Sequence, residues 1–562
     1  MGLPDAEGGG RGARCNPASR FLKTRGLAVI IVCGSTAPMR LRLLALVGAL
    51  VDAKRIHPRR LAANASSAAR RLLADDRWPT AALAWNATRR LTSEKLVAPA
   101  AHAVTRLPGL PADWAGNHYA GMIDSDDKGG GRLFYWFFER DEENPAGPKA
   151  TPLLIWLNGG PGCSSMDGLF LELGPLRVAP GSPNGKARLE RRPSSWHRAA
   201  HALFLDQPVG TGFSRTSGRS YCRDDACIVN QFETFLARFV RSYKHLVMKD
   251  DKTSVPIFFA GESHAGHYVP LMMEHLLFKA TSGINWDVRG AALGNAWIDP
   301  RHQYDVSRMA STLGLISDRE AARLQEKEKQ CQRKLDQRVY VSKLCWDLLD
   351  DVVKATRASP TLGGPGLGAN QYDARDAVRS SRFFPPGHEG VEAYMNQADV
   401  RAALHVDAQS QRFRECADPP YDALQHQDGL GVAPSLRRLL DAAAHKRPRL
   451  LFYNGQTDLI CNHVGVDRSL RALDWAGKAD FARAEARPWL RSGHVAGFLK
   501  RARNLALLAV RDSGHMVPMD QPAAALDMIA AFIGDAAFGG ADEEKKVCAD
   551  ACLGRHHKRG GH

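Results

Sequence analysis

The chain has 562 residues, 44% of them hydrophobic and 24% charged, which is ordinary globular composition and excludes disorder throughout. Its formal net charge of +16 could indicate an anionic partner, but many of the cations lie near the two ends of the chain, outside the part that carries the motifs described below. No nucleic-acid-binding module is recognisable, so we expect no nucleic-acid partner and interpret the charge as a solvated basic surface.

A short apolar segment near the N-terminus is typical of a secretory signal peptide. Residues 39–53 begin with two arginines close together, continue with an apolar core and end in small residues. The core is too short to cross a bilayer, which takes about 20 apolar residues. We predict an N-terminal extension and signal peptide over residues 1–53 and a propeptide or spacer over residues 54–105. No later stretch looks like a membrane span, so we expect a secretory-pathway protein of the vacuole, lysosome or extracellular space.

Two further features fit passage through the secretory pathway. Asn64 and Asn86 each begin an N-glycosylation triplet. Eleven cysteines suit an oxidising compartment, and their spacing forms no zinc-binding pattern, so we expect disulfides and no metal site. Because the number of cysteines is odd, at least one thiol stays unpaired.

Short apolar runs recur between helical patterns along the chain. Several runs are almost uniformly apolar, which is typical of strands buried on both faces of a mostly parallel sheet. Helical patterns follow, such as "NQFETFLARFVRSYKHLV" and "PAAALDMIAAFIG". The alternation predicts an α/β fold with a doubly wound sheet. The expected strands, in chain order, are "RLFYWFFE", "PLLIWLNGG", "ALFLDQP", "VPIFFAGES", "VRGAALGNA", "PRLLFYNG" and "LALLAVRDSGH".

The pattern changes between about residues 305 and 390. A charged helical stretch, "SDREAARLQEKEKQCQRKLDQRV", is followed by the Gly/Pro-rich "ASPTLGGPGLGANQ". We interpret this part as an insertion over the catalytic face, partly a helical lid and partly a flexible loop. Residues 536–562 are expected to form a peripheral, charged C-terminal tail.

Ser263 lies where an expected strand turns into an expected helix, within "IFFAGESHAGHYVP". A strand that enters a tight turn and leaves as a helix presents the turn residue at the carboxyl edge of the sheet, with helix N–H groups beneath it. Ser is also a common helix N-cap, so the motif alone is only moderately specific. A serine becomes a nucleophile when a base takes its proton and an acid orients that base.

The base and the orienting acid are expected after Ser263, at the ends of later strands. The strand "RPRLLFYNG" is followed by "QTDLICN", which contains Asp458, and the strand "LALLAVRDSGH" ends in His515. Order and strand-end placement agree, so we predict the catalytic triad Ser263, Asp458 and His515.

Other titratable residues near these motifs compete for the same roles. His264 is adjacent to Ser263 and His267 lies one helical turn further along. A side chain next to the apex points away from it, and His267 is better explained by packing in the helix. Asp512 and Asp520 flank His515, and we interpret both as strand-end or loop polar groups.

Nine linked stretches occur in order along the chain: "HYAGMI", "LFYWFFE", "PLLIWLNGGPGCSSMDGLFLELGP", "LFLDQPVGTGFS", "GESHAGHYVP", "LGNAWIDPRHQY", "YMNQADVRAALHV", "YNGQTDLICN" and "GHMVPMDQP". With these motifs the chain resembles the serine carboxypeptidase family over roughly residues 105–535. The resemblance implies an α/β-hydrolase fold, with a carboxypeptidase domain over 106–535.

The resemblance implies the same triad and adds an oxyanion hole made by the backbone N–H groups of Gly160 and His264. It also implies that peptide or protein C-termini are the substrate and that no cofactor is needed. The residues implied to bind the terminal carboxylate are Asn158, Gly159, Glu172 and Glu262, with Trp156 as a wall of the site.

Two glutamates facing a carboxylate would repel it if both were ionised. At least one of Glu172 and Glu262 must therefore carry a proton and donate it to the substrate. This requirement predicts tighter peptide binding, and hence activity, at acidic pH.

Three positions depart from the family pattern. His264 replaces the usual tyrosine after the nucleophile, so we expect a shorter and titratable pocket wall. Gln456 replaces an acid, which leaves Asp458 as the only carboxylate of its turn. Arg192 replaces an asparagine, so we expect the loss of a supporting hydrogen bond.

The resemblance also implies a disulfide between Cys163 and Cys416. Cys331 with Cys345 is a candidate pair that closes the insertion, and Cys222 with Cys227 a candidate pair that closes a short loop. Cys461, close to Asp458, is the candidate free thiol and is expected to line the pocket.

The predicted function is that of a serine-type carboxypeptidase that hydrolyses the C-terminal peptide bond through an acyl-enzyme. One alternative is an acyltransferase of the same family, which passes the acyl group to an alcohol, although Glu262 with Asn158 favours peptide hydrolysis. The other is a protective or scaffolding partner of other proteins. The sequence leaves a homodimer open.

Overall fold

The computed structural model describes residues 96–126, 130–141, 151–179, 188–218, 220–357, 367–378 and 387–534. It also gives the backbone of two short N-terminal strands, β1 (Lys23–Thr24) and β2 (Leu27–Ala28), which pair antiparallel in a separate unit, residues 1–92. Apart from that backbone, the expected signal peptide, most of the spacer, the sites at Asn64 and Asn86 and the C-terminal tail lie outside the described residues.

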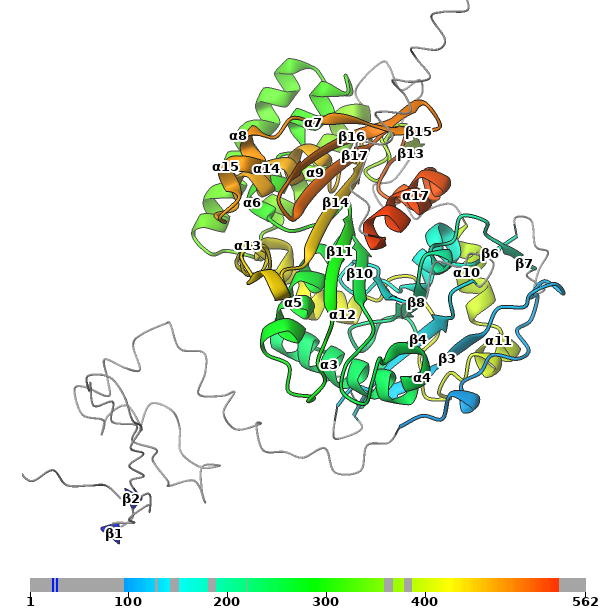
Figure 1. Cartoon of the computed structure of the whole chain (residues 1–562). Helices are drawn as coiled ribbons and strands as arrows, with labels where there is room; N and C mark the ends of the chain where they lie inside the picture. The colour runs from blue at the N-terminus through cyan, green and yellow to red at the C-terminus, as the bar shows by residue number, and fades with distance from the viewer. Residues whose placement is uncertain are drawn as a thin grey trace, which may run out of the picture. The chain divides into compact units, whose positions relative to one another are not determined.

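The described part of the chain is built around an eleven-stranded sheet (Figure 1). The strand order is β15-β16-β17-β14-β11-β10-β5-β8-β4-β3, and β9 pairs with β4. Six consecutive strands at its centre run parallel, and antiparallel strands extend both edges. The parallel strands are β5 (Leu153–Leu157), β8 (His201–Leu205), β10 (Ile257–Glu262), β11 (Val288–Gly294), β14 (Arg449–Gly455) and β17 (Leu505–Val510). The antiparallel strands are β3 (His118–Asp124), β4 (Gly131–Phe138), β9 (Arg215–Thr216), β15 (Arg487–Arg491) and β16 (His494–Ala502).

All seven strands expected from apolar runs are present, so the mostly parallel sheet is confirmed. The expected set did not include β3, β9, β15 and β16. β16 is partly exposed along its length and mixes charged with apolar residues, so it carries no uniform apolar run.

Helices cover both faces of the sheet, as expected (Figure 1). The side chains of β5 show that both faces are buried. Leu153, Ile155 and Leu157 belong to one apolar cluster, whereas Leu154 and Trp156 belong to the other. Because strand side chains alternate between faces, a run buried on both faces must be apolar throughout.

The first cluster includes residues of α3 (Asp225–Ser242), α4 (Lys244–Val247), α5 (Ala265–Phe278), α13 (Ala433–Leu440), α14 (His463–Ala472) and α15 (Lys478–Arg483). The second includes residues of η4 (Gly168–Leu173), η5 (Trp196–Arg198), α10 (His388–Met395), α11 (Ala398–Ala403), α16 (Val517–Asp520) and α17 (Pro522–Ile533). The remaining short elements are η3 (Pro99–Ala101), β6 (Leu176–Val178) paired with β7 (Leu189–Arg191), α6 (Pro300–Gln303), α12 (Asp418–Leu424), η7 (Gln425–Gly429) and η8 (Ala444–Lys446).

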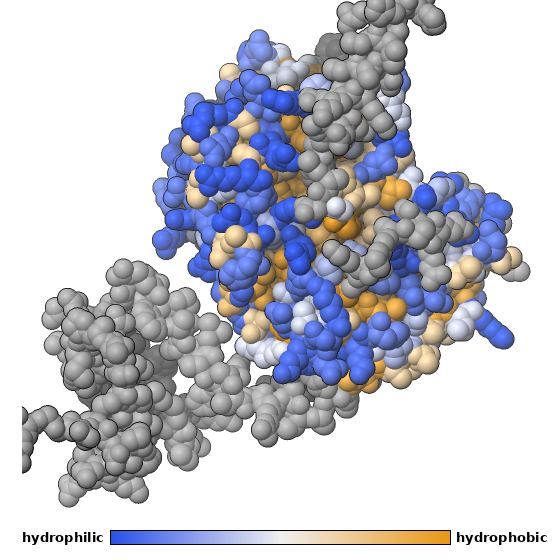
Figure 2. Space-filling view, viewed as in Figure 1, coloured by the Kyte–Doolittle hydropathy of each residue, from blue (hydrophilic) through white to orange (hydrophobic). Residues whose placement is uncertain are grey.

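The described residues of the expected insertion include three helices and a short hairpin. The helices are α7 (Ser307–Thr312), α8 (Asp318–Asp336) and α9 (Lys343–Arg357), and the hairpin joins β12 (Gly368–Ala369) to β13 (Ala377–Val378). The charged stretch thus forms α8, and the surface over α8 and α15 is mainly hydrophilic (Figure 2). The role of this part as a lid stays a prediction.

The helices of the described residues include none that combines the length and the apolar character needed to cross a membrane.

Candidate active site

Ser263 occupies the turn between β10 and α5 in a left-handed backbone conformation, with φ of 61°. Its N–H donates to the carbonyl of Gly294 at 3.0 Å, and its carbonyl accepts from the N–H of Trp297 at 2.8 Å. The turn has no room for a side chain at Gly261, where a Cβ would lie 2.6 Å from that of Ala265. The hydrogen bonds with Gly294 and Trp297 therefore hold Ser263 in a backbone conformation that serine rarely adopts.

Asp458 follows β14 and is fully buried, yet its carboxylate is surrounded by donors. Oδ2 accepts from the side-chain amide of Asn295 at 2.6 Å, from Nδ1 of His515 at 2.8 Å and from the N–H of Cys461 at 3.2 Å. Oδ1 accepts from the N–H of Ile460 at 3.0 Å. These four hydrogen bonds stabilise the ionised carboxylate in a buried place.

His515 lies between Asp458 and Glu262 at the end of the segment that follows β17. Because an ionised carboxylate can only accept, Nδ1 carries the proton of its bond to Asp458 and leaves Nε2 free to accept one. Nε2 lies 4.0 Å from Oε1 of Glu262. The N–H of His515 donates to the carbonyl of Tyr372 at 2.7 Å, and the two rings meet edge to face at 5.0 Å.

Ser263 and His515 line the same cavity of about 490 Å³. The cavity thus brings two triad candidates to one solvent-accessible space, while Asp458 lies buried behind His515. Among its other lining residues are Asn158, Gly159, Gly160, Glu262, Asp167 and Glu415.

The Asn158–Gly160 loop lies against the turn that carries Ser263. A Cβ on Gly159 would lie 2.5 Å from the backbone nitrogen of His264 and 2.9 Å from Cβ of Ser263. Only glycine allows this close approach.

The side-chain oxygen of Asn158 already accepts two hydrogen bonds within the protein. Oδ1 accepts from Nε1 of Trp156 at 2.6 Å and from the N–H of Gly168 at 3.1 Å, so the NH₂ of Asn158 remains for Glu172 or a ligand. The expectation that Trp156 is a wall of the site is corrected here. Trp156 does not line the cavity, and it acts by orienting Asn158.

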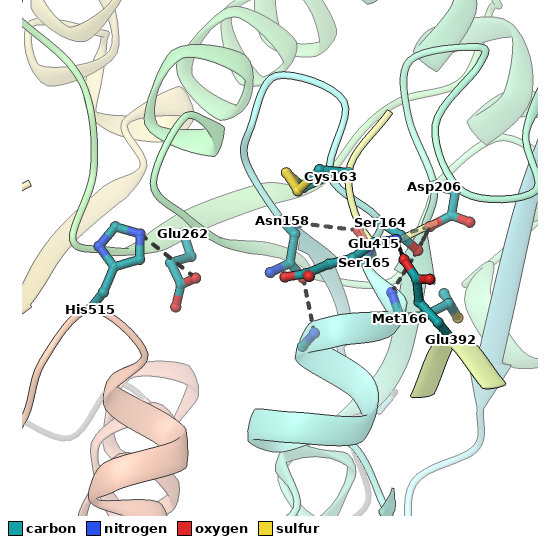
Figure 3. The surroundings of a disulfide bond; sticks show 12 residues. Asn158, Cys163, Ser164, Ser165, Met166, Asp206, Glu262, Glu392, Glu415 and His515 are labelled. Carbon is teal, nitrogen blue, oxygen red and sulfur yellow. Dashed lines mark hydrogen bonds and ion pairs between the residues drawn. A yellow bond between two sulfur atoms is a disulfide. The ribbon is translucent and has the colours of Figure 1, made fainter. Parts of the chain in front are cut away.

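Both candidate glutamates are buried, and Glu262 lies between His515 and Asn158 (Figure 3). Burial raises the pKa of Glu172 to about 7, against the lowering effects of a hydrogen bond with Glu262 and of the His515 charge. Burial, and then the charge of Glu172, raise the pKa of Glu262 well above its ordinary value. Glu262 lines the cavity and Glu172 does not, so a proton retained on Glu262 faces the ligand space.

A second group of acids, which includes Asp206, Glu392 and Glu415, lies beside the disulfide loop (Figure 3), and no sequence motif singles it out. Oδ1 of Asp167 and Oε2 of Glu415 are buried and have no hydrogen-bond partner among the described residues. Burial raises the pKa of Glu415 to about 8, helped by the charge of Glu392, and burial also raises the pKa of Asp167. Asp206 is different, because its Oδ1 accepts from Oγ of Ser164 at 2.6 Å.

The two histidines near Ser263 face away from the cavity. Nε2 of His264 hydrogen bonds with Oε1 of Gln427 at 3.0 Å, and Nε2 of His267 with Oδ1 of Asp225 at 3.0 Å. Burial lowers the pKa of His264 to about 3. The expectation of a titratable pocket wall at His264 is therefore wrong, since its ring stays neutral and does not line the cavity.

Arg192 also differs from expectation, because it supplies hydrogen bonds to η4. Its Nη2 donates to the carbonyl of Phe170 at 2.5 Å, and its Nε to that of Gly174 at 3.2 Å. Arg192 thus supports the π-helical segment that carries Glu172. The turn around Gln456 likewise has a carboxylate nearby, since Asp373 from the insertion accepts from Oγ1 of Thr457 at 2.8 Å.

The three expected disulfides are present, and Cys461 is a buried free thiol. Cys461 lies close to Asp458 and His515, and burial followed by the charge of Asp458 raises its thiol pKa well above the ordinary value. A neutral thiol is a poor nucleophile. Cys461 does not line the cavity, which corrects that expectation. The disulfides join Cys163 to Cys416, Cys222 to Cys227 and Cys331 to Cys345.

Known proteins are similar in sequence to most of this chain. A family model described as serine carboxypeptidase matches residues 108–535. The Phytophthora infestans protein named pheromone-processing carboxypeptidase KEX1 is 35% identical over 439 residues, covering 76% of this chain and 71% of the relative. Serine carboxypeptidase S10 family member 2 of Dictyostelium discoideum is 32% identical over 451 residues, covering 77% and 76%.

A solved crystal structure is also similar to this chain. The crystal structure of Kex1(delta)p, a prohormone-processing carboxypeptidase from Saccharomyces cerevisiae, has 26% sequence identity and a TM-score of 0.68, and covers 78% of this chain and 97% of that one. The expected α/β-hydrolase fold is confirmed by this similarity and by the sheet described above.

Proposed function

Because this chain belongs to the serine carboxypeptidase family and is a serine-type carboxypeptidase, we propose that Ser263, His515 and Asp458 are its catalytic triad. The observation that carries the proposal is the 2.8 Å hydrogen bond from His515 to the buried carboxylate of Asp458, at a cavity lined by both His515 and Ser263. This bond fixes the tautomer in which Nε2 can take a proton.

In the proposed mechanism Oγ of Ser263 attacks the carbonyl carbon of the C-terminal peptide bond. Nε2 of His515 takes the serine proton and gives it to the leaving amine, which departs as the free C-terminal amino acid. Water then hydrolyses the acyl-enzyme with His515 as base. The N–H groups of Gly160 and His264 are proposed to stabilise the oxyanion, supported by the close approach of the Asn158–Gly160 loop to the His264 nitrogen.

Exopeptidase action requires recognition of the terminal carboxylate. We assign this recognition to the NH₂ of Asn158, the backbone of Gly159 and a protonated Glu262 backed by Glu172. The raised pKa values of both glutamates support the assignment, because a protonated carboxyl can donate to a carboxylate. Binding should then be tighter at acidic pH, where the pair keeps its protons.

The acids beside the carboxylate site favour a basic C-terminal residue. Asp167 and Glu415 line the cavity, and each has a buried oxygen with no hydrogen-bond partner among the described residues. A lysine or arginine side chain would supply the missing donors and a compensating positive charge. We therefore propose peptides ending in Lys or Arg as preferred substrates.

The test compares release of the C-terminal amino acid at pH 5 from blocked dipeptides that end in Arg, Lys or Leu. We expect strong release that disappears in Ser263→Ala, and a Glu415→Gln variant that loses activity on Arg and Lys but keeps it on Leu. Release by Ser263→Ala would refute the triad. Equal losses on all three substrates in Glu415→Gln would refute the specificity while leaving the triad intact.

Peptide hydrolysis also separates this proposal from the acyltransferase alternative, which predicts transfer of the acyl group to added alcohols. Glu262 in the cavity favours hydrolysis, because it provides a group for a free carboxylate. The disulfides fit an oxidising compartment, so we place the protein in the secretory pathway, in the vacuole, lysosome or extracellular space.

A further inference from the structure

A short segment of the insertion, residues 370–376, lies between the loop that carries Asp458 and the loop that carries His515. We call it the 370–376 clasp. Its ends are fixed by the antiparallel pairing of β12 with β13, in which Gly368 lies opposite Val378.

The backbone of the clasp makes hydrogen bonds to both loops. The carbonyl of Gln371 accepts from the N–H groups of Leu459 at 3.0 Å and Ile460 at 3.1 Å, directly after Asp458. The carbonyl of Tyr372 accepts from the N–H of His515 at 2.7 Å. A clasp that shifted would therefore move both loops.

The fit is close on the side of His515. A Cβ on Gly514, the residue before it, would lie 2.6 Å from the carbonyl oxygen of Tyr372 and 2.7 Å from Cβ of Asp373. The loop therefore packs on the clasp without a gap at this point.

A chain of polar side chains runs parallel to these backbone contacts. Oγ1 of Thr457 donates to Oδ1 of Asp373 at 2.8 Å, and Nε of Arg375 donates to the same oxygen at 2.9 Å. Nη2 of Arg375 donates to Oδ2 of Asp520 at 2.9 Å, and that oxygen also accepts from the N–H of Gly514 at 2.7 Å. The chain thus begins at the residue before Asp458 and ends at the residue before His515.

Arg375 is the centre of this chain, because it also donates through Nη1 to the carbonyl of Asp512 at 2.7 Å. A guanidinium with several donors in one plane can hold three acceptors in fixed directions, which a lysine cannot do. Arg375 is charged in the whole accessible pH range, since its hydrogen bonds with Asp373 raise its pKa further.

We propose that Arg375 is a positioning residue of the active site, which acts through Asp373 and Asp520 to align Asp458 with His515. The inference deepens the proposed function and depends on it. Arg375 is 40% exposed at its side chain, so its ion pairs contribute little to the stability of the fold. Its effect should appear in the chemical step, where displacement of a catalytic group by about 1 Å can cost about 10²-fold in rate.

A competing explanation is that Arg375 only contacts the substrate, because the clasp also lines the cavity. Two measurements separate the explanations. Substrate contact alone predicts a change in KM. Alignment of the triad predicts a change in kcat and in the rate at which diisopropyl fluorophosphate, a small reagent that occupies no peptide subsite, inactivates Ser263.

The experiment uses the full-length processed enzyme with Arg375→Ala, Arg375→Lys and, as a matched control, Arg323→Ala. Arg323 is an exposed arginine of the same insertion that pairs with Glu320 on α8. We expect Arg375→Ala to lower kcat and the inactivation rate by about 10- to 100-fold, with KM and the unfolding midpoint almost unchanged. Arg375→Lys should restore part of the activity, and Arg323→Ala should match the wild type.

An unchanged inactivation rate in Arg375→Ala, or a loss confined to KM, would overturn the inference. So would an equal loss in Arg323→Ala. If the wild-type enzyme itself releases no amino acid and is not inactivated, the proposed function fails instead, and the two failures are thus distinguishable.

Discussion

The side-chain amide of Asn295 donates to Oδ2 of Asp458 at 2.6 Å, the same oxygen that accepts from His515. Asn295 follows β11 with a φ of 40°, and its Oδ1 accepts from the N–H of Gly455 at the end of β14. One asparagine therefore connects two neighbouring parallel strands and fixes the carboxylate between them. The sequence shows it in "LGNAWIDP", but nothing there marks it as a partner of Asp458.

Asn295→Ala should lower kcat by about 10- to 100-fold, because a hydrogen bond to a charged group contributes about 1.5–3 kcal/mol and each 1.4 kcal/mol is about tenfold in rate. Steady-state kinetics on a blocked dipeptide measures the effect. Wild-type kcat in a folded variant would show that the other three donors suffice to hold Asp458.

The pH dependence of KM should follow the glutamate pair. Below about pH 7, the pKa of Glu172, the pair keeps its protons, and Glu262 can donate to the substrate carboxylate. At higher pH an added negative charge repels that carboxylate, so KM should rise by about tenfold per pH unit once one proton is lost. KM measured from pH 4.5 to 8.5 checks this.

Glu262→Gln is the matched variant for the same measurement, because an amide keeps a donor but does not titrate. We expect its KM to change little with pH and to stay above the wild-type value at pH 5. A variant whose KM follows the wild-type curve would place the titration elsewhere.

Gly159→Ala should nearly abolish activity. Its Cβ would lie 2.5 Å from the nitrogen of His264 and 2.8 Å from the carbonyl oxygen of Glu262, so the Asn158–Gly160 loop or the turn that carries Ser263 must move. Loss of one oxyanion donor lowers the rate by about 10²–10³. Gly390→Ala is the control, because its Cβ would meet its nearest neighbour at 3.6 Å. Normal kcat/KM in Gly159→Ala would mean that the loop can withdraw without affecting catalysis.

The Cys163–Cys416 disulfide should contribute both to stability and to substrate binding. It joins residues 253 apart, and the carbonyl of Glu415, next to Cys416, accepts from the N–H of Ser164 at 2.7 Å. Replacing both cysteines by alanine should cost about 2–5 kcal/mol of the free energy of unfolding and raise KM for substrates ending in Arg.

The Cys222–Cys227 pair provides the comparison, since it closes a loop between residues only 5 apart. The chain-entropy argument predicts that this disulfide adds about 2 kcal/mol to the free energy of unfolding. Neither of its cysteines lines the cavity. Replacing Cys222 and Cys227 by alanine should therefore change the free energy of unfolding, measured with denaturant, and KM less than replacing Cys163 and Cys416. Equal effects of the two double variants on KM would argue against a specific role of the Cys163–Cys416 disulfide in holding Glu415 at the cavity.

The strands that carry the site could be predicted from the sequence because they are buried on both faces. A run such as "LLIWL" must be apolar throughout. Ser263, Asp458 and His515 each follow one of these runs within a few residues. Edge strands such as β16 could not, because an exposed strand has no such requirement. Three disulfides were also predictable, two of them from short spacing and one from family resemblance.

The sequence by itself determined the fold class, the order of the strand-end residues and the resemblance that makes the chain a serine carboxypeptidase, because periodicity and linked motifs are local properties of a chain. Only the tertiary structure decided that Trp156 supports Asn158, that His264 turns away from the cavity, and that Asn295, Asp167, Glu415 and Arg375 lie around the triad. These contacts join residues that are mostly tens to hundreds of positions apart, and their pKa values depend on burial, which exists only once the chain is packed.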